Sequence, residues 1–197
     1  MPPGPRCLVG GALIALTIAG CGAAASGRGG GSAVSPNPAP RTQAPALPAA
    51  RWGRLRLPSG AVLPYPAGWR VVAGDPGSAS AALYGPERTI RAYLNATPAE
   101  GHETLAGWAR FRVRHNAAEG DRGVRLIAAR TGVRLAGGRA ACVIDDYATS
   151  RSRYRELACI VAPADRGKAT VLVAAAQPSE WGRERPLLES ALDHFTA

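Results

Sequence analysis

One hairpin constrains the fold of this chain more than any other stretch, because a single register satisfies several side-chain pairs at once. Residues 140–149 and 153–162 are two strand-like segments on either side of a short turn between Ser150 and Arg151. A turn centred there opposes Cys142 to Cys159, Ile144 to Leu157, Asp146 to Arg155, Tyr147 to Tyr154 and Val143 to Ala158. Each non-covalent pair of this kind contributes about 0.2–1 kcal/mol, so their coincidence favours this register over its neighbours.

This register also makes two chemical predictions. Opposed strand residues have Cα atoms about 4.5–5.5 Å apart, which is within disulfide reach, so we predict a disulfide between Cys142 and Cys159. Asp145 comes opposite Glu156, which is costly unless the two carboxylates are solvated or shared with nearby arginines. Asp145 and Asp146 point to opposite faces of one strand and cannot act as one carboxylate pair. We expect a surface Asp145 and a salt-bridged Asp146.

The remaining pattern predicts an α+β fold, an antiparallel sheet that is mainly a meander, with two helices packed on it. A helix is favoured over residues 103–118 by length and by an apolar face of Leu105, Trp108, Ala109, Phe111 and Val113, although Arg112 lies within that arc and the alternation at 110–114 would also suit a strand. A second helix has its stripe between Leu187 and Phe195. We expect further strands at 55–57, 61–63, 70–72, 79–84, 89–95, 124–129, 133–135 and 169–175, the last of them central.

The N-terminal residues have the organisation of an export signal. Arg6 precedes an apolar run from Cys7 to Ala19, which is shorter than the roughly 20 residues of a transmembrane helix. Ile18-Ala19-Gly20-Cys21 is similar to the lipobox of bacterial lipoproteins. That resemblance implies cleavage before Cys21, a lipid on its thiol and a position on the extracytoplasmic side of the cell membrane. The alternative is a signal in which Cys21 has no role.

These features divide the chain into three parts: a lipoprotein signal peptide at 1–20, a lipidated, disordered Gly/Ala/Pro-rich tether at 21–50, and one α+β domain at 51–197. With Cys7 removed and Cys21 acylated, one pair of cysteines remains in an oxidising compartment. The chain has 24 basic and 14 acidic residues and a formal net charge of +10. Its arginines are dispersed, which favours a solvated surface over attraction to anionic lipid and excludes a nucleic-acid partner.

Four short segments carry a family resemblance: Pro66-Ala67-Gly68-Trp69, the helix around Leu105–Trp108, the stretch from Leu135 to Ala141, and Leu187–Phe195. In this order they resemble the α/β sandwich of PsbP-like and DcrB-like proteins and of actinobacterial LpqN-type lipoproteins. The resemblance covers residues 55–196. It implies an antiparallel sheet with helices packed on it and an accessory, assembly or binding role, with no enzyme activity common to the family.

Catalytic and metal-binding patterns are weak in this sequence. His102, His115 and His194 are far apart and lack metal-ligand spacing, and there is no Gly-x-Ser-x-Gly elbow or phosphate loop. We therefore expect no enzyme activity, no catalytic residue, no cofactor and no metal. Trp69, Trp108 and Trp181 either pack in the core, which we favour, or line a ligand groove, and Trp52 is the aromatic residue expected to be exposed.

Two functions remain open at this stage. The favoured one is a non-enzymatic interaction or assembly module of the cell envelope, held at the membrane through Cys21 and docked to an envelope protein. The other is a carrier or sensor for a small apolar or lipidic ligand held between sheet and helix. A filled core favours the first and a cavity favours the second.

Overall fold

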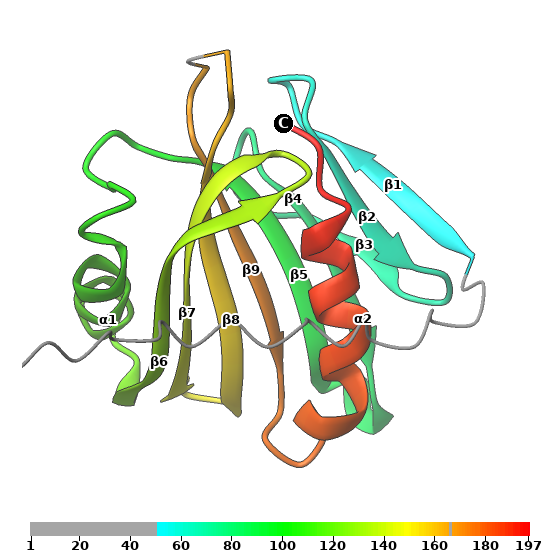
Figure 1. Cartoon of the computed structure of the whole chain (residues 1–197). Coiled ribbons are helices and arrows are strands. Elements are labelled where there is room, and N and C mark those ends of the chain that lie inside the picture. The colour runs from blue at the N-terminus through cyan, green and yellow to red at the C-terminus, as the bar shows by residue number, and fades with distance from the viewer. Residues whose placement is uncertain (1–50, 166) are drawn as a thin grey trace, which may run out of the picture. The chain divides into compact units, whose positions relative to one another are not determined.

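The structure, a computed structural model, describes residues 51–165 and 167–197. Seven antiparallel strands form the main sheet of this part of the chain (Figure 1). The predicted signal peptide, the tether and Cys21 lie outside these residues. The strands are β3 (Arg70–Val72), β4 (Ala79–Tyr84), β5 (Ile90–Pro98), β9 (Thr170–Ala176), β8 (Arg153–Ala162), β7 (Gly138–Ala148) and β6 (Arg122–Leu135), in that order across the sheet. The predicted α+β class and the central position of β9 are confirmed.

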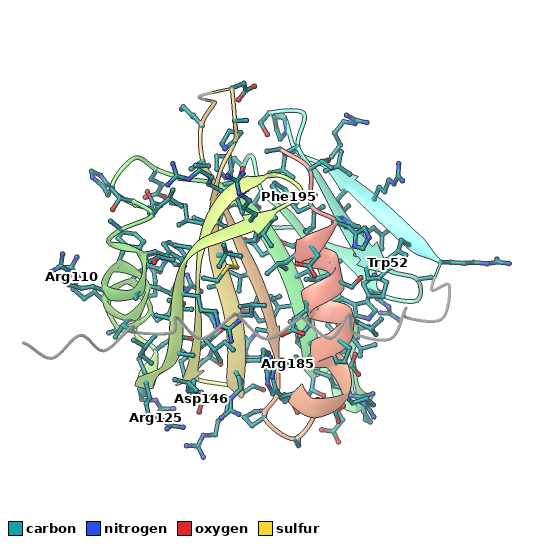
Figure 2. All side chains as sticks on the ribbon, viewed as in Figure 1. Trp52, Arg110, Arg125, Asp146, Arg185 and Phe195 are labelled. Carbon is teal, nitrogen blue, oxygen red and sulfur yellow. A yellow bond between two sulfur atoms is a disulfide. The ribbon has the colours of Figure 1, made fainter. Side chains whose placement is uncertain are left out.

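The hairpin of β7 and β8 has the predicted register. Cys142 pairs with Cys159, Ile144 with Leu157, Asp146 with Arg155 and Tyr147 with Tyr154. The two cysteines form a disulfide with a Cα–Cα separation of 4.1 Å, the yellow bond in Figure 2. Figure 2 also shows Asp146 beside Arg125 of β6, at the end of the sheet where this hairpin turns. The strands β6, β7, β8 and β9 follow one another as the expected meander.

Strand β6 differs from the prediction of two separate strands at 124–129 and 133–135. It is one strand of 14 residues whose pairing with β7 shifts register at three places. Gly132, with φ of 69°, lies within the shift between Arg130 and Val133. A bulge therefore absorbs the glycine that the sequence suggests as a break.

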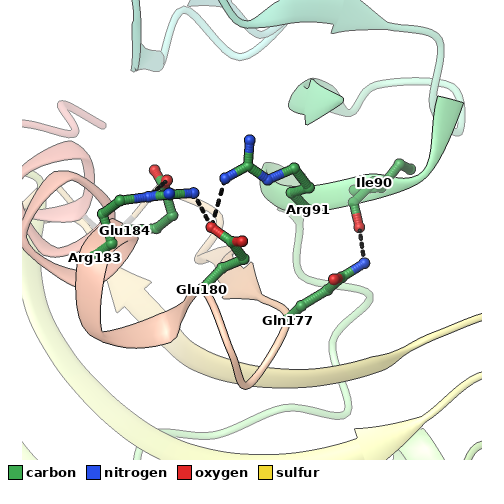
Figure 3. A network of polar contacts seen from close by, with 6 residues as sticks. All are labelled: Ile90, Arg91, Gln177, Glu180, Arg183 and Glu184. Atoms are coloured by element: carbon green, nitrogen blue, oxygen red, sulfur yellow. Dashed lines mark hydrogen bonds and ion pairs between the residues drawn. The ribbon is translucent and has the colours of Figure 1, made fainter. Parts of the chain in front are cut away.

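Helix α2 (Trp181–Asp193) packs on one face of the sheet together with the hairpin of β1 (Trp52–Arg56) and β2 (Val62–Pro66). Leu188, Leu192 and Phe195 are buried in this larger core. Polar contacts tie the start of α2 to the start of β5 (Figure 3): Arg91 and Arg183 both donate to Glu180, and the Gln177 amide donates to the Ile90 carbonyl at 3.0 Å. These contacts fix where the helix crosses the sheet.

Helix α1 (Trp108–Ala118) lies on the opposite face, where it packs on β6, β7 and β8. It begins five residues later than predicted. Before it, the Glu103 carboxylate accepts backbone N–H groups from residues 100–102, and the Thr104 hydroxyl accepts the Gly107 N–H at 3.0 Å. These local bonds stabilise a turn where the sequence suggests the first helical turn. Over β4, β5 and β9, no helix of the described residues covers this face of the sheet.

Removing the disulfide should destabilise the fold measurably. The bond closes a loop between residues separated by 17 positions, and in the chain-entropy model its loss through Cys142→Ala with Cys159→Ala costs about 3 kcal/mol. Urea unfolding of both forms measures this difference. A loss below about 1 kcal/mol would contradict the account, and Cys142→Ala alone provides a control for the free thiol that remains.

Candidate functional site

A groove of about 740 Å³ occupies the half of the sheet that α1 leaves uncovered. Its floor consists mainly of β4, β5 and β9 residues, with Tyr147 of β7 and Tyr154 of β8, and α1 provides one wall. Its volume falls in the range of about 300–1,000 Å³ that is typical of small-molecule sites. The floor contributes Ala82, Tyr93, Asn95, Val171 and Val173, among others.

Aromatic side chains line the groove on two sides. On the α1 wall, the Trp108 ring stacks on Phe111 with ring centres 5.8 Å apart, and Phe111 stacks on His115 at 5.6 Å. Tyr93 and Tyr154 meet edge to face at 5.5 Å on the floor. Such pairs keep broad apolar surfaces in place without closing the groove.

A charged pair is buried between α1 and the sheet at the inner wall of this groove. The Arg112 guanidinium donates to both carboxylate oxygens of Glu156, at 2.5 and 2.9 Å, and the Glu156 side chain has no exposed surface. Asn116, one helical turn further along α1, lies near the same carboxylate at 3.5 Å. Bidentate geometry of this kind makes the pair directional and thus orients the helix as well as holding it.

Asp145 lies opposite Glu156 and is fully buried, with neither carboxylate oxygen hydrogen-bonded. The expectation of a surface Asp145 is therefore wrong, because α1 covers this face of β7. Burial, and then the charge of Glu156, raise the pKa of Asp145 to about 8 against the opposing effect of Arg112. A protonated Asp145 can donate to Glu156, whose carboxylate accepts both hydrogen bonds from Arg112.

The tyrosines connect this charged group to the groove. The hydroxyls of Tyr93 and Tyr147 are hydrogen-bonded to each other, and the Tyr154 hydroxyl donates to the Ile90 carbonyl at 3.2 Å. Burial, together with the charge of Glu156, raises the pKa of Tyr93 and of Tyr147 well above the ordinary value of a phenol. All three rings are neutral hydrogen-bonding groups at physiological pH.

The sequence contains a signal for this site. Arg112 interrupts the apolar arc of α1, and the β7–β8 register places two acids, Asp145 and Glu156, opposite each other. A buried arginine on the helix is the natural counter-charge for such a pair. The expectation that these acids share an arginine is confirmed for Glu156. Asp146 is salt-bridged as predicted, to Arg155 and Arg125, both at 2.7 Å.

The four tryptophans have separate outcomes. Trp69, Trp108 and Trp181 are buried as expected, and Trp108 also lines the groove. The expectation that Trp52 is exposed is wrong, because it is half-buried against the core on the α2 side. Packing and groove lining are thus not alternatives for Trp108.

Two other hollows lie within the described residues. One, of about 240 Å³, lies between α2 and the β6–β8 part of the sheet beside the disulfide, and is smaller than most ligand sites. The other adjoins the groove and is lined by Arg122, Arg151 and Arg153 around the β7–β8 turn. Because it shares Tyr147, Thr149, Ser150, Arg151 and Tyr154 with the groove, we treat it as the end of the same site.

Metal ligands do not gather anywhere in residues 51–165 and 167–197: no group of three or more His, Cys, Asp or Glu is arranged to hold an ion. No helix within the described residues is long and apolar enough to cross a membrane. The groove residues offer hydrogen bonds and aromatic surface to a ligand.

Comparison with known proteins identifies the fold. No family model matches the chain, and no curated protein matches it. Among solved structures it is similar to cyanobacterial PsbP (CyanoP) from Synechocystis sp. PCC 6803, with TM-score 0.52 and 20% identity over 77% of this chain and 95% of that one. LpqN of Mycobacterium tuberculosis, described as involved in cell envelope biogenesis, aligns with TM-score 0.45 and 14% identity over 76% and 91%.

A third structure, the Pseudomonas aeruginosa protein PA94 described as a putative regulator of unknown function, aligns with TM-score 0.48 and 16% identity over 75% of this chain and 97% of that one. The chain has the fold expected from the resemblance to PsbP-like proteins. Identities this low say nothing about its ligands.

Arg112→Met should destabilise the protein by about 3–5 kcal/mol, because it leaves Glu156 buried without its counter-charge. Arg155→Met is the matched control: its ion pair with Asp146 is partly exposed and Asp146 keeps Arg125, so the expected loss is below about 1 kcal/mol. Urea unfolding of both variants gives the comparison, and equal losses would contradict the assignment.

Asp145→Asn should make stability less dependent on pH. The folded-state pKa of Asp145, about 8, lies above the unfolded value. Its contribution to the free energy of unfolding is therefore fully present below about pH 4 and is lost as pH rises toward 8. The variant lacks this loss, so its free energy of unfolding relative to the wild type should rise by up to about 1.4 kcal/mol per pH unit between pH 4 and 8. Thermal unfolding at pH 4, 6 and 8 measures it, and a pH-independent difference would refute the raised pKa.

Proposed function

We propose that this chain is a non-enzymatic binding module of the cell envelope, tethered to the membrane through a lipid on Cys21. Its binding site is the groove beside α1. The single observation that carries the proposal is a preformed groove of ligand-site volume at the place where a helix covers only half of one sheet face.

The lining supports a ligand that is held by shape and hydrogen bonds. Tyr93, Phe111 and Tyr154 provide aromatic surface, while Asn95 and Ser80 provide an amide and a hydroxyl that already contact each other at 2.8 Å. This mixture suits a polar ligand better than the small apolar or lipidic ligand that the sequence left open. Within the part of the chain that the structure describes, no hydroxyl of the groove is hydrogen-bonded to a histidine, which supports binding over catalysis.

The tether and anchor belong to the same proposal. Residues 1–21 have the signal and lipobox pattern, and two acyl chains on one cysteine suffice for stable anchoring. A lipid-anchored binding domain would sample ligands within reach of the membrane surface. Globomycin blocks lipoprotein signal cleavage, so treated cells should contain the uncleaved chain. A chain of the same mass in treated and untreated cells would refute the anchor.

Filling the groove should abolish ligand binding without affecting the anchor. Thr97 is half-buried on β5 and lines the groove, so Thr97→Phe places a ring there in a residue type suited to strands. Native mass spectrometry of the chain extracted from its own envelope should show a released small molecule for the wild type and none for the variant.

The matched control is Thr131→Phe, which adds the same ring at an exposed position of β6 outside the groove. It should retain the bound molecule. A Thr97→Phe variant that keeps the molecule, or a Thr131→Phe variant that loses it, would overturn the groove as the site.

Protein docking along β6 is the second candidate. This strand is the edge of the sheet and exposes Leu126 and Ile127, 43% and 41% accessible. Its three register shifts and its arginines are, however, features that protect edge strands from pairing with other chains. We therefore rank it below the groove.

Crosslinking in the envelope separates the two candidates. If β6 docks a partner, Leu126→Glu with Ile127→Glu should remove a crosslinked band that the wild-type chain gives. We expect the band pattern to be unchanged. Loss of a specific band, with retention in Val71→Glu at another exposed apolar residue, would favour docking.

A further inference from the structure

The groove has charges of opposite sign at its two ends. It extends along β5, whose residues from Ile90 to Pro98 span about 26 Å at 3.3 Å per residue. Both termini of this strand contribute to the lining. The charged lining residues can therefore be assigned to one end or the other from the strand register.

One end is acidic. Glu100 and Glu103 follow directly after β5, and Asp75 precedes β4, whose first residue Ala79 pairs with Ala96 near the end of β5. Burial opposes ionisation of Glu103, but backbone N–H groups of residues 100–102 hold its pKa below the ordinary value. Among the described residues of this end, the lining includes three carboxylates and no arginine or lysine. Lys168 lies in the neighbouring loop, outside the lining.

The other end is basic. Arg151 lies in the β7–β8 turn, and Arg122 and Arg153 line the adjoining hollow, next to Ala148 and Tyr154. The Tyr154 hydroxyl donates to the Ile90 carbonyl, which places this end at the start of β5. Two acids are present as well: Glu119, and Asp146, which is already paired with two other arginines. Figure 1 shows the β7–β8 turn and the segment between β5 and α1 at opposite ends of the sheet.

Between the ends the lining carries little free charge. Arg112 is neutralised by Glu156, and the rest includes the tyrosines, Phe111, His115, the Ser80–Asn95 pair and apolar residues of the floor. We propose that the groove binds an elongated zwitterion, with its cationic group at the acidic end and its anionic group at the arginine end. This rests on the proposed function and adds the chemical class of the ligand, of which a short peptide with free termini is the simplest member.

The length and the polar lining both suit an extended peptide. Six residues span roughly 20 Å when extended, which brings the two terminal charges close to the two ends of the groove. The Asn95 amide and the hydroxyls of Ser80 and Thr97 can exchange hydrogen bonds with a backbone, and the aromatic rings can cover small side chains. An orientation follows: the ligand's amino group lies near Glu100 and its carboxylate near Arg151.

A set of four peptides tests the proposal. A hexapeptide of alternating serine and alanine is prepared with both termini free, with the amino end acetylated, with the carboxyl end amidated, and with both blocked. Each is titrated calorimetrically against the full chain in nanodiscs of zwitterionic lipid, with empty nanodiscs subtracted. Each free terminus should strengthen binding about three- to fivefold, so the free peptide should bind about 10- to 25-fold tighter than the doubly blocked one.

Two variants assign each charge to one end. Asp75→Asn with Glu100→Gln should remove the benefit of the free amino group and leave that of the carboxylate, and Arg151→Met should do the reverse. These side chains are exposed and have no side-chain partner in the described structure, so both variants should fold. Glu87→Gln and Arg88→Met, exposed charges outside the groove lining, are the matched controls and should change neither benefit.

The outcomes separate this inference from the proposed function. Equal affinities for all four peptides, a preference for one charge alone, or no binding at millimolar concentration would each overturn the zwitterion. In those cases the groove remains a ligand site if a molecule co-purifies with the wild type and is lost in Thr97→Phe. If no molecule co-purifies but the free peptide binds with the predicted charge dependence, the inference stands. The extracted chain had then not retained its ligand during purification.

Discussion

The α1 side of the molecule depends on the ion pair between Arg112 and Glu156. A helix with an apolar stripe could slide or rotate on a sheet of small residues such as Ala141, Ala158 and Ala175. A bidentate arginine accepts only a narrow range of positions. Two apolar residues of the same volume would stabilise the fold as well or better, so we infer that the pair's main effect is to specify where α1 lies.

That position determines what is left uncovered. Because α1 is held over β6, β7 and β8, its Trp108–Phe111–His115 column becomes a wall and the neighbouring strands become a floor. The buried Asp145 increases the cost of this arrangement, since the fold must keep it protonated beside Glu156. Buried polar groups without partners are rare in folded proteins, and they are concentrated at functional sites. The burial of Asp145 is therefore consistent with the proposed binding site beside α1.

Much of this fold was predictable from local pattern, and the part that was not has a physical reason. The β7–β8 register follows from side chains that lie opposite each other on neighbouring strands, and the helix at the C-terminus follows from one clear stripe ending at Phe195. The burial of Asp145 depends on which face α1 covers, a long-range choice that strand alternation does not encode. The same holds for the groove, whose two ends come from segments as distant as Asp75 and Arg151.

The most direct test of this account is the exchange behaviour of the Arg112 side chain in ¹⁵N NMR spectra at neutral pH. An arginine Nε–H that donates to a buried carboxylate should exchange slowly with water and remain visible, with a hydrogen-bond coupling to Glu156. Arg110, which points away from the sheet on the same helix in Figure 2, and the exposed Arg114 are internal references whose Nε–H signals should be lost to fast exchange. A signal for Arg112 that disappears with theirs would contradict the account.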